Sequence, residues 1–136
     1  MGVLILPPAL RRQIVIHTRA LRPREACGVL LGRSADGSTR VEGVLPAPNV
    51  AADPRTRYSI DVAELFAAHR TARDESRDVV GYFHSHPGGP AVPSRMDRES
   101  AWAGMRQLIV GWAGSEPELR CWVFDPHPEE EGVRAC

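Results

Sequence analysis

The chain has 136 residues, 17 basic and 17 acidic side chains and a formal net charge of zero, which suits one domain with its own core and gives no sign of a nucleic-acid partner. Its three scattered cysteines do not resemble the disulfide framework of a small secreted protein, and no segment approaches the ~20 apolar residues of a membrane span. Because the first residues also lack a signal-peptide pattern, we expect a cytoplasmic protein without a membrane partner.

The first half of the chain predicts one amphipathic helix among short strands. Pro8 to Leu21 places Leu10, Ile14 and Leu21 on a similar face, with a proline near the start of the helix. Around this helix, short apolar segments bounded by turn residues predict strands. They cover Val3–Leu6, Gly28–Gly32, Thr39–Pro46 and Arg57–Ile60, the last three as a meander.

The second half predicts two further helices and three strands. Asp61 is expected to cap a helix over Val62–Arg73, with Glu64 as its capping-box partner, and another helix opens at Ser94. Strands are expected at Val79–His86, Gln107–Trp112 and Leu119–Phe124. The turn sequence at 114–117 makes the last two strands a hairpin.

This element order predicts a single α/β domain over residues 1–125, with a mixed β-sheet and helices packed on it. Residues 126–136 are polar and contain prolines, so we expect a loose C-terminal tail. Trp102, Trp112 and Trp122 recur at ten-residue intervals. A binding surface is one interpretation, but we expect core packing, because aromatic side chains normally bury a large area.

Potential metal ligands follow the apolar strand that ends at His86. Side chains two residues apart on a strand point to the same face, so His84 and His86 can reach one ion while Ser85 points away. The Pro/Gly-rich loop at 87–93 leads into a helix that can fold Asp97 back over both imidazoles. Two imidazoles and one carboxylate suit zinc and leave a fourth coordination position open, which is typical of a catalytic site.

Structural explanations stay open for some of these residues. Ser94-x-x-Asp97 after a proline is also a helix capping box, a sufficient reason for both residues. The two roles are compatible, since a cap would hold Ser94 in place. Without further information, Glu25 would be a surface or helix-end carboxylate. Cys27 has a nucleophile interpretation, but a small thiol at the start of an apolar strand is more often buried and inert.

The spacing His84-x-His86-x7-Ser94-x2-Asp97 resembles the signature of the JAMM (MPN+) zinc metallopeptidases, in their small prokaryotic form. The segment 23–32 (PREACGVLLG) is similar to the element in which that family places a glutamate, here Glu25. Pro48-Asn49 and the segment 57–61 (RYSID) look like weaker landmarks of the same family. The resemblance covers nearly the whole chain.

The resemblance implies a cytidine-deaminase-like mixed sheet flanked by helices, with one Zn²⁺ per chain held by His84, His86 and Asp97. It assigns Glu25 as general base and Ser94 as donor to the developing oxyanion. The implied reaction is hydrolysis after the Gly-Gly tail of a ubiquitin-like or sulfur-carrier protein, at a peptide or an isopeptide bond. Two alternatives stay open: a DNA-repair accessory resembling the RadC group, and a non-catalytic MPN scaffold. The oligomeric state is left open.

Overall fold

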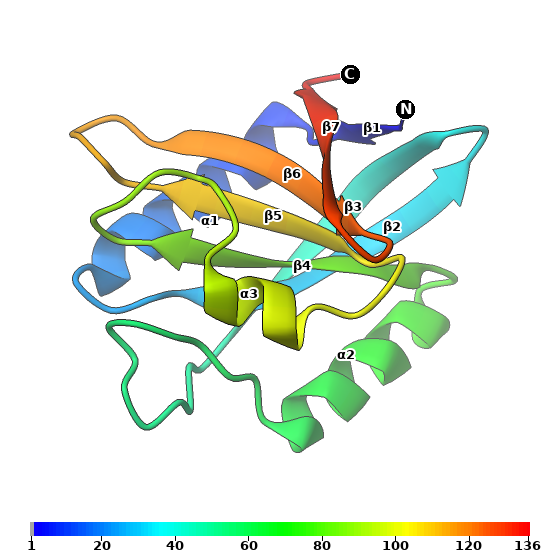
Figure 1. Cartoon of the computed structure of the whole chain (residues 1–136). Helices are drawn as coiled ribbons and strands as arrows, with labels where there is room; N and C mark the ends of the chain where they lie inside the picture. The colour runs from blue at the N-terminus through cyan, green and yellow to red at the C-terminus, as the bar shows by residue number, and fades with distance from the viewer. Residues whose placement is uncertain (1) are drawn as a thin grey trace.

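The computed structural model describes residues 2–136, which form three helices and seven strands (Figure 1). The helices are α1 (Pro8–Leu21), α2 (Val62–Asp74) and α3 (Arg95–Ser100). The strands are β1 (Val3–Ile5), β2 (Cys27–Ala35), β3 (Ser38–Ala47), β4 (Asp78–His86), β5 (Arg106–Gly111), β6 (Glu118–Phe124) and β7 (Pro128–Arg134). Every helix predicted from the sequence has an observed counterpart, and so does every predicted strand except one.

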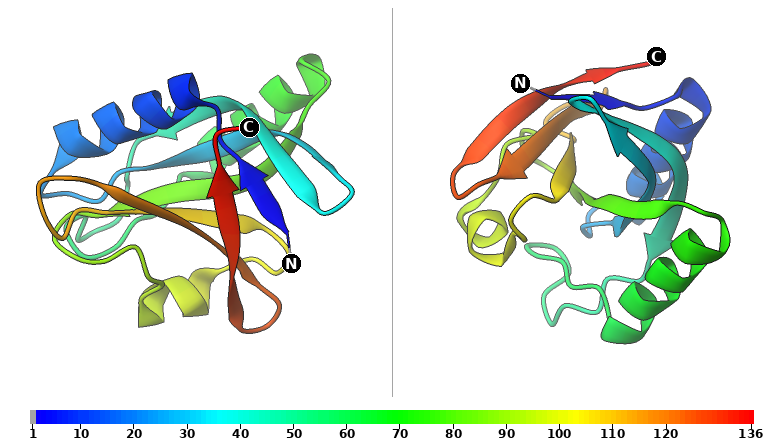
Figure 2. Two further views of the ribbon diagram at one scale, coloured as in Figure 1. Left: turned by 90° about the horizontal axis from the view of Figure 1, so that it is seen from above. Right: turned by 90° about the vertical axis from the view of Figure 1, so that its right-hand side faces the viewer.

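The strands form one mixed sheet in the order β1-β3-β2-β4-β5-β6-β7, and this sheet closes into a barrel. Closure depends on β1, which pairs in parallel with both β3 and β7; the left panel of Figure 2 shows β1 beside β7. β4 lies at the centre, antiparallel to β2 and parallel to β5. The predicted single α/β domain with a mixed sheet is confirmed, and the predicted β5–β6 hairpin is antiparallel as expected. The closure was not predicted, and the cytidine-deaminase-like description remains a prediction.

Helices α1 and α2 cover opposite faces of the central strands (Figure 2, right panel). Ile14 of α1 packs in one buried cluster with Leu30 and Phe83, whereas Ala68 of α2 packs in another with Tyr82. Adjacent residues of a strand point to opposite faces, and β4 contributes Val80 and Phe83 to the first cluster and Val79 and Tyr82 to the second. β4 is therefore buried on both faces and hydrogen-bonded along both edges, which gives its C-terminal end a well-fixed position.

Two predictions in the segment that leads to α2 are wrong. Residues Arg57–Ile60 form no strand, because the Ser59 backbone bonds to the Asn49 side chain and to Val50 of the same loop instead of to a neighbouring strand. Asp61 is the N-cap residue of α2, but its side chain makes no capping hydrogen bond and no capping box with Glu64 forms. Residues 48–61 therefore form an irregular loop, and Figure 1 shows it next to the C-terminal end of β4.

The expectation of a loose C-terminal tail is also wrong for most of its length. Residues 128–134 form β7, which pairs with β6 and with β1 and so completes the barrel. A strand at this position needs few apolar side chains, since its hydrogen bonds come from the backbone and one of its faces meets solvent. The predicted domain boundary after residue 125 remains a prediction.

The three tryptophans differ in their environment. Trp112 is 1% exposed, as expected for a core residue, and Trp122 is half-buried. Trp102 is 52% exposed, so the prediction of core packing is wrong there. It follows α3 directly and contacts Tyr82 edge-on, with ring centroids 5.7 Å apart.

Membrane insertion was not expected from the sequence. Within the described range, 2–136, no helix has the length and apolar character that a transmembrane span requires.

Candidate metal and catalytic site

The structure brings together the three residues that the sequence motif predicted as metal ligands. His84 and His86 lie at the end of β4, and Asp97 lies in the first turn of α3. Asp97 Oδ1 is 3.2 Å from His84 Nε2, and Asp97 Oδ2 is 3.0 Å from His86 Nε2. One ligand atom from each residue lies within 4.8 Å of the others, a spacing that one metal ion can bridge. We call these three residues the metal triad.

Ser85 lies between the two histidines but does not join them. Its hydroxyl is buried and accepts a hydrogen bond of 2.8 Å from the Ala26 backbone N–H, while its own N–H donates to the Ala26 carbonyl. The alternation expected of a strand is therefore observed. These two bonds also fasten the end of β4 to the residue that follows Glu25.

The capping box predicted at the start of α3 is present. The Asp97 N–H donates to Ser94 Oγ at 3.1 Å, and the Ser94 N–H donates to Asp97 Oδ2 at 2.9 Å. Ser94 Oγ acts as an acceptor in this pair, so its own proton stays available for another partner. Capping and catalysis are therefore compatible here, and the catalytic role of Ser94 remains a prediction.

The two imidazoles have different hydrogen-bond partners. His86 Nδ1 lies 2.8 Å from the Pro90 carbonyl oxygen, which accepts its proton and leaves Nε2 directed at Asp97. His84 is 1% exposed; within the described range its Nδ1 has no hydrogen-bond partner, and its Nε2 faces Asp97 Oδ1 at 3.2 Å without hydrogen-bond geometry. A buried polar atom without a partner is costly, and coordination to a metal ion would satisfy it. The triad therefore fits a metal ion.

The Tyr58 ring packs against the face of the His84 ring. The two rings stack with centroids 4.5 Å apart and 21° between their planes, and the Tyr58 hydroxyl donates to Gln107 at 3.4 Å. Burial raises the pKa of Tyr58, so this group stays a neutral phenol. The sequence motif singled out 57–61 only as a landmark and gave no role to Tyr58.

Electrostatics favour a neutral His84 beside an ionised Asp97. Burial lowers the pKa of His84, and the opposing effect of Asp97 is smaller. Burial by itself would raise the pKa of Asp97, but the facing imidazoles and the Ser94 N–H hold it well below its usual range. Neutral imidazole and carboxylate are the protonation states that bind metal.

Glu25 lies just before β2, and its side chain is only 6% exposed. Burial raises the pKa of Glu25 to about 7; the charge of Asp97 adds to this rise and His86 opposes it. Its Oε1 has no hydrogen-bond partner among the described residues. A carboxyl group with a pKa near neutrality can both accept and release a proton at physiological pH, which is what a general base requires.

Asn49 ties the backbone of Glu25 to the 48–61 loop. Its Nδ2 donates to the carbonyl oxygens of Glu25 and Arg57, each at 3.0 Å, and its Oδ1 accepts from the N–H groups of Ala51 and Ser59 at 3.1 Å. The Glu25 N–H in turn donates to the Pro54 carbonyl at 2.7 Å. Sequence reasoning noted Pro48-Asn49 only as a landmark. The sequence feature that could have indicated this role is a single asparagine shortly after a predicted strand, where its side chain can bond to backbone groups of the loop.

Cys27 does not have the environment of a nucleophile. Its side chain is fully buried, and its thiol faces the Ala47 carbonyl at 3.5 Å. Burial, helped by the charge of Glu25, raises the pKa of the Cys27 thiol to about 12. A thiol of this kind stays protonated, in agreement with the inert interpretation.

Two open grooves flank the metal triad. The first, here called the base-side groove, encloses about 320 Å³ and is lined by Glu25, Arg55, His86 and Ser94 among others. The second, the aromatic groove, encloses about 220 Å³ and is lined by Tyr58, Ile60, Leu65, Tyr82, Trp102 and Gln107 among others. His86 lines the first groove, and Tyr58, which stacks on His84, lines the second.

Residues 7–125 match the family model for Prok-JAB, the prokaryotic homologs of the JAB domain. The chain belongs to this family. The match confirms the resemblance to the JAMM (MPN+) enzymes that the sequence motif suggested. A solved structure, the solution structure of protein DSY2949 from Desulfitobacterium hafniense, is 29% identical, covers 98% of this chain and 91% of its own, and superposes with a TM-score of 0.86.

Several named proteins are similar to this chain in sequence. "Desampylase" from Haloferax volcanii is 40% identical over 69% of this chain and 73% of its own length. "Probable TtuB-protein conjugate cleaving protease" from Thermus thermophilus is 36% identical over 82% of this chain and 72% of its own. "CysO-cysteine peptidase" from Mycobacterium tuberculosis is 38% identical over 70% of this chain and 63% of its own.

Proposed function

We propose that this protein is a zinc-dependent metallopeptidase that hydrolyses the bond after the Gly-Gly tail of a ubiquitin-like or sulfur-carrier protein. The observation that carries the proposal is the metal triad, in which the buried His84 faces Asp97 but makes no hydrogen bond through its ring, next to a groove that Glu25 lines. The three relatives are named as a desampylase, a conjugate-cleaving protease and a CysO-cysteine peptidase. These names support an enzyme over a non-catalytic scaffold.

His84, His86 and Asp97 would hold the ion. Two nitrogen donors and one oxygen donor suit zinc, and three protein ligands leave one position free. When bound there, Zn²⁺ would supply Lewis acidity toward a carbonyl oxygen and would make a water molecule more acidic. The Pro90 carbonyl fixes the orientation of His86, and Tyr58 fixes that of His84, so the chain supports the geometry of both imidazoles.

Glu25 and Ser94 would perform the proton transfer and the oxyanion stabilisation. Glu25 takes a proton from the attacking water and later gives it to the departing amine. Its pKa of about 7 suits both steps, since the group is neither fully ionised nor fully protonated near neutral pH. The free hydroxyl proton of Ser94 would donate to the carbonyl oxygen as negative charge develops, a contribution commonly worth about 3 kcal/mol.

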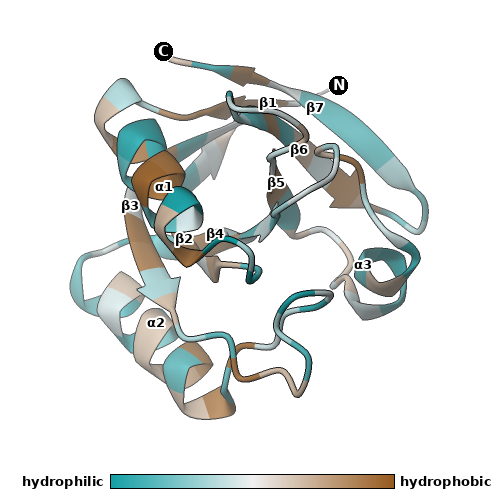
Figure 3. Ribbon diagram, turned by 90° about the vertical axis from the view of Figure 1, so that its left-hand side faces the viewer, coloured by the Kyte–Doolittle hydropathy of each residue, from teal (hydrophilic) through white to brown (hydrophobic). Residues whose placement is uncertain are grey.

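A protein carrier as substrate is supported by exposed apolar residues around the aromatic groove. Trp102, 52% exposed, lines this groove. Val62 and Phe66 of α2, 61% and 66% exposed, are close in sequence to Leu65, which also lines it. Figure 3 shows apolar colour at the end of α2 that faces the 48–61 loop. Large exposed apolar side chains of this kind are typical of protein-contact surfaces. A Gly-Gly tail would suit a bond that must come close to the triad, because glycine allows close backbone approach.

The test is hydrolysis of defined conjugates by the purified zinc-loaded protein. We expect cleavage after Gly-Gly in a carrier conjugate, and mass spectrometry of both products identifies the cleaved bond. A Glu25→Gln variant with the same zinc content should not cleave the conjugate. Replacing the terminal glycine with valine should lower kcat/KM at least about tenfold, which corresponds to roughly 1.4 kcal/mol. Equal turnover of the glycine and valine conjugates would contradict the Gly-Gly specificity but not the peptidase activity.

A further inference from the structure

Arg55 is an exposed arginine that lines the base-side groove together with Glu25, His86 and Ser94. Among residues 2–136, no carboxylate lies within 4 Å of its guanidinium. The acidic loop residue nearest to it in sequence, Asp53, instead accepts a hydrogen bond from the Thr56 hydroxyl at 2.9 Å. The groove therefore contains a cationic side chain that has no anionic partner within the chain.

The backbone on both sides of Arg55 is fixed relative to Glu25. The Pro54 carbonyl accepts the Glu25 N–H at 2.7 Å, and the Arg57 carbonyl accepts from Asn49 Nδ2 at 3.0 Å. Asn49 also bonds the Glu25 carbonyl at 3.0 Å. Arg55 and Glu25 therefore belong to one hydrogen-bonded unit of backbone and line the same groove.

The direction of the substrate follows from proton transfer. Glu25 must reach the departing amine to protonate it, so the amine side of the cleaved bond lies in the base-side groove. The acyl side then crosses the metal triad toward the aromatic groove, where Tyr58 and Trp102 lie. In this orientation Arg55 would lie on the side of the leaving group and not on that of the Gly-Gly tail.

Glu25 contributes a carboxylate to this groove, and this carboxylate would repel a leaving group that carries an anion. Such a leaving group therefore needs a cation in the groove to offset the repulsion. A free amino acid joined through its α-amine carries a carboxylate one carbon away from the nitrogen that departs. A lysine joined through its ε-amine carries no carboxylate near that nitrogen. The planar guanidinium binds carboxylates in a bidentate manner, which adds geometric selection to the charge.

We propose that Arg55 is a specificity-determining residue that binds the α-carboxylate of the leaving group, so that this chain prefers conjugates of a single free amino acid over lysine isopeptides. The inference rests on the proposed peptidase function and names its leaving-group class. The reaction is ordinary hydrolysis: water adds to the Gly-Gly carbonyl, the C–N bond breaks, and the amino acid leaves as an amine with its carboxylate paired to Arg55.

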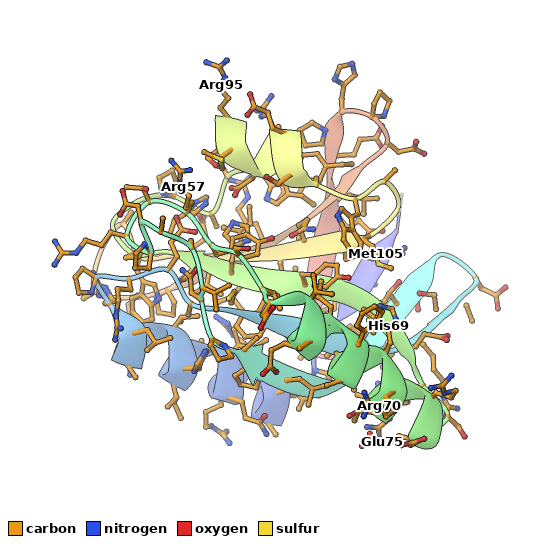
Figure 4. All side chains as sticks on the ribbon, turned by 90° about the horizontal axis from the view of Figure 1, so that it is seen from below. Arg57, His69, Arg70, Glu75, Arg95 and Met105 are labelled. Atoms are coloured by element: carbon orange, nitrogen blue, oxygen red, sulfur yellow. The ribbon has the colours of Figure 1, made fainter. Side chains whose placement is uncertain are left out.

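The experiment uses three conjugates of one carrier, the CysO protein of the mycobacterial relative, each with Gly-Gly before the cleaved bond. One ends in Gly-Gly-Ala with a free carboxylate, one ends in Gly-Gly-alaninamide, and one joins Gly-Gly to the ε-amine of a lysine inside a peptide. The full chain, zinc-loaded, is compared with Arg55→Gln, Arg55→Lys and the control Arg57→Gln. Arg57 is exposed on the same loop, labelled in Figure 4, and lies outside the groove lining.

We expect the unchanged protein to cleave Gly-Gly-Ala with a kcat/KM at least about tenfold above that for the amide and the isopeptide. Arg55→Gln should lower kcat/KM for Gly-Gly-Ala about tenfold and leave the amide unaffected, so that the preference disappears. Arg55→Lys should keep part of the preference, since it retains charge but not the bidentate fork. Arg57→Gln should keep all of it.

Three results would overturn the inference. Equal turnover of acid and amide by the unchanged protein would show that the carboxylate is not recognised. An equal loss on both conjugates in Arg55→Gln would assign Arg55 to attraction of the carrier instead. If the zinc-loaded protein cleaves none of the three conjugates, nor the matching conjugate of the TtuB carrier, the proposed function itself fails and the inference fails with it. This last result can be told from the first two, because they require measurable cleavage, whereas here neither the unchanged protein nor any variant cleaves a conjugate.

Discussion

Tyr58 lies flat against His84, with ring centroids 4.5 Å apart and an interplanar angle of 21°. The contact joins the irregular 48–61 loop to the buried end of β4, 26 positions away in sequence. Because His84 Nδ1 has no hydrogen-bond partner among the described residues, stacking is the contact that fixes this ring from the loop side. Tyr58 is therefore a positioning residue for a proposed metal ligand.

Tyr58→Ala is expected to weaken zinc binding by about 10- to 100-fold, the usual cost of losing support behind a ligand. Tyr58→Phe keeps the stacked ring and loses only the 3.4 Å hydrogen bond to Gln107, so its zinc affinity should stay close to that of the unchanged protein. Competition with a chromophoric chelator measures both. Equal affinities in all three proteins would remove the positioning role.

We expect one zinc ion per chain, and Asp97→Ala should reduce the bound zinc and abolish peptide hydrolysis. Asp97 faces both imidazoles at 3.0–3.2 Å, so its loss removes one donor and leaves the two histidines without their anionic partner. Elemental analysis after dialysis gives the stoichiometry. The exposed Glu99 of the same helix provides the control, since Glu99→Gln should change neither quantity. Full zinc content and turnover in Asp97→Ala would refute the ligand assignment.

The metal triad could be predicted because its geometry is almost entirely local. Strand alternation puts His84 and His86 on one face, and a short loop followed by a capping box returns Asp97 to them, all within 14 residues of chain. The helix α1 was predicted at its observed bounds for a similar reason, since its apolar period and its proline act within one segment.

Features that depend on distant segments were missed. The bonds of Asn49 to Glu25 span 24 positions, and no local pattern shows that an amide will replace a strand partner for Ser59. β7 was taken for a tail because its side chains are polar, whereas its position is set by backbone pairing to β1 at the other end of the chain. Glu25 entered only through family resemblance, since an isolated glutamate has no distinguishing local pattern.

Ser94→Ala should separate capping from catalysis. Loss of the cap removes the hydrogen bond from the Asp97 N–H, so the free energy of unfolding should fall by about 1 kcal/mol. Loss of the hydroxyl donor should lower kcat by about 10²–10³, with zinc retained. Ser94→Asp is the informative control, because aspartate caps helices well but cannot donate a proton when ionised. If Ser94→Asp restores both stability and kcat, Ser94 acts only as a cap.

Glu25→Gln should retain zinc and fold while kcat falls by about 10²–10⁴, because the substitution removes proton transfer but keeps the size of the side chain. The chemical step is measured by single-turnover kinetics with zinc content determined on the same samples. Cys27→Ser serves as the comparison for a conservative change at a buried position two residues from Glu25 and should cost far less, given its inert thiol. Near-normal kcat in Glu25→Gln would exclude the general-base role.

The same residue predicts how the stability of the metal-free protein depends on pH. The folded pKa of Glu25 is raised from 4.5 to about 7, so folding is favoured while the group is protonated. This contribution is fully present below about pH 4.5 and is lost as the pH rises through 7, where ionisation of the buried carboxyl destabilises the fold. The loss amounts to roughly 3.5 kcal/mol at most, since the pKa rises by about 2.5 and each pKa unit corresponds to ~1.4 kcal/mol.

Urea denaturation of zinc-free protein at several pH values between about 4.5 and 8 measures this loss. Over that range the unchanged protein should lose stability relative to Glu25→Gln, whose amide does not ionise. Glu64→Gln is a suitable control, because Glu64 is exposed on α2 and its replacement should leave the pH profile unaltered. A constant stability difference between the unchanged protein and Glu25→Gln across the range would mean that Glu25 ionises as an ordinary glutamate. It would then lack the raised pKa that suits it to accept and release a proton near neutrality.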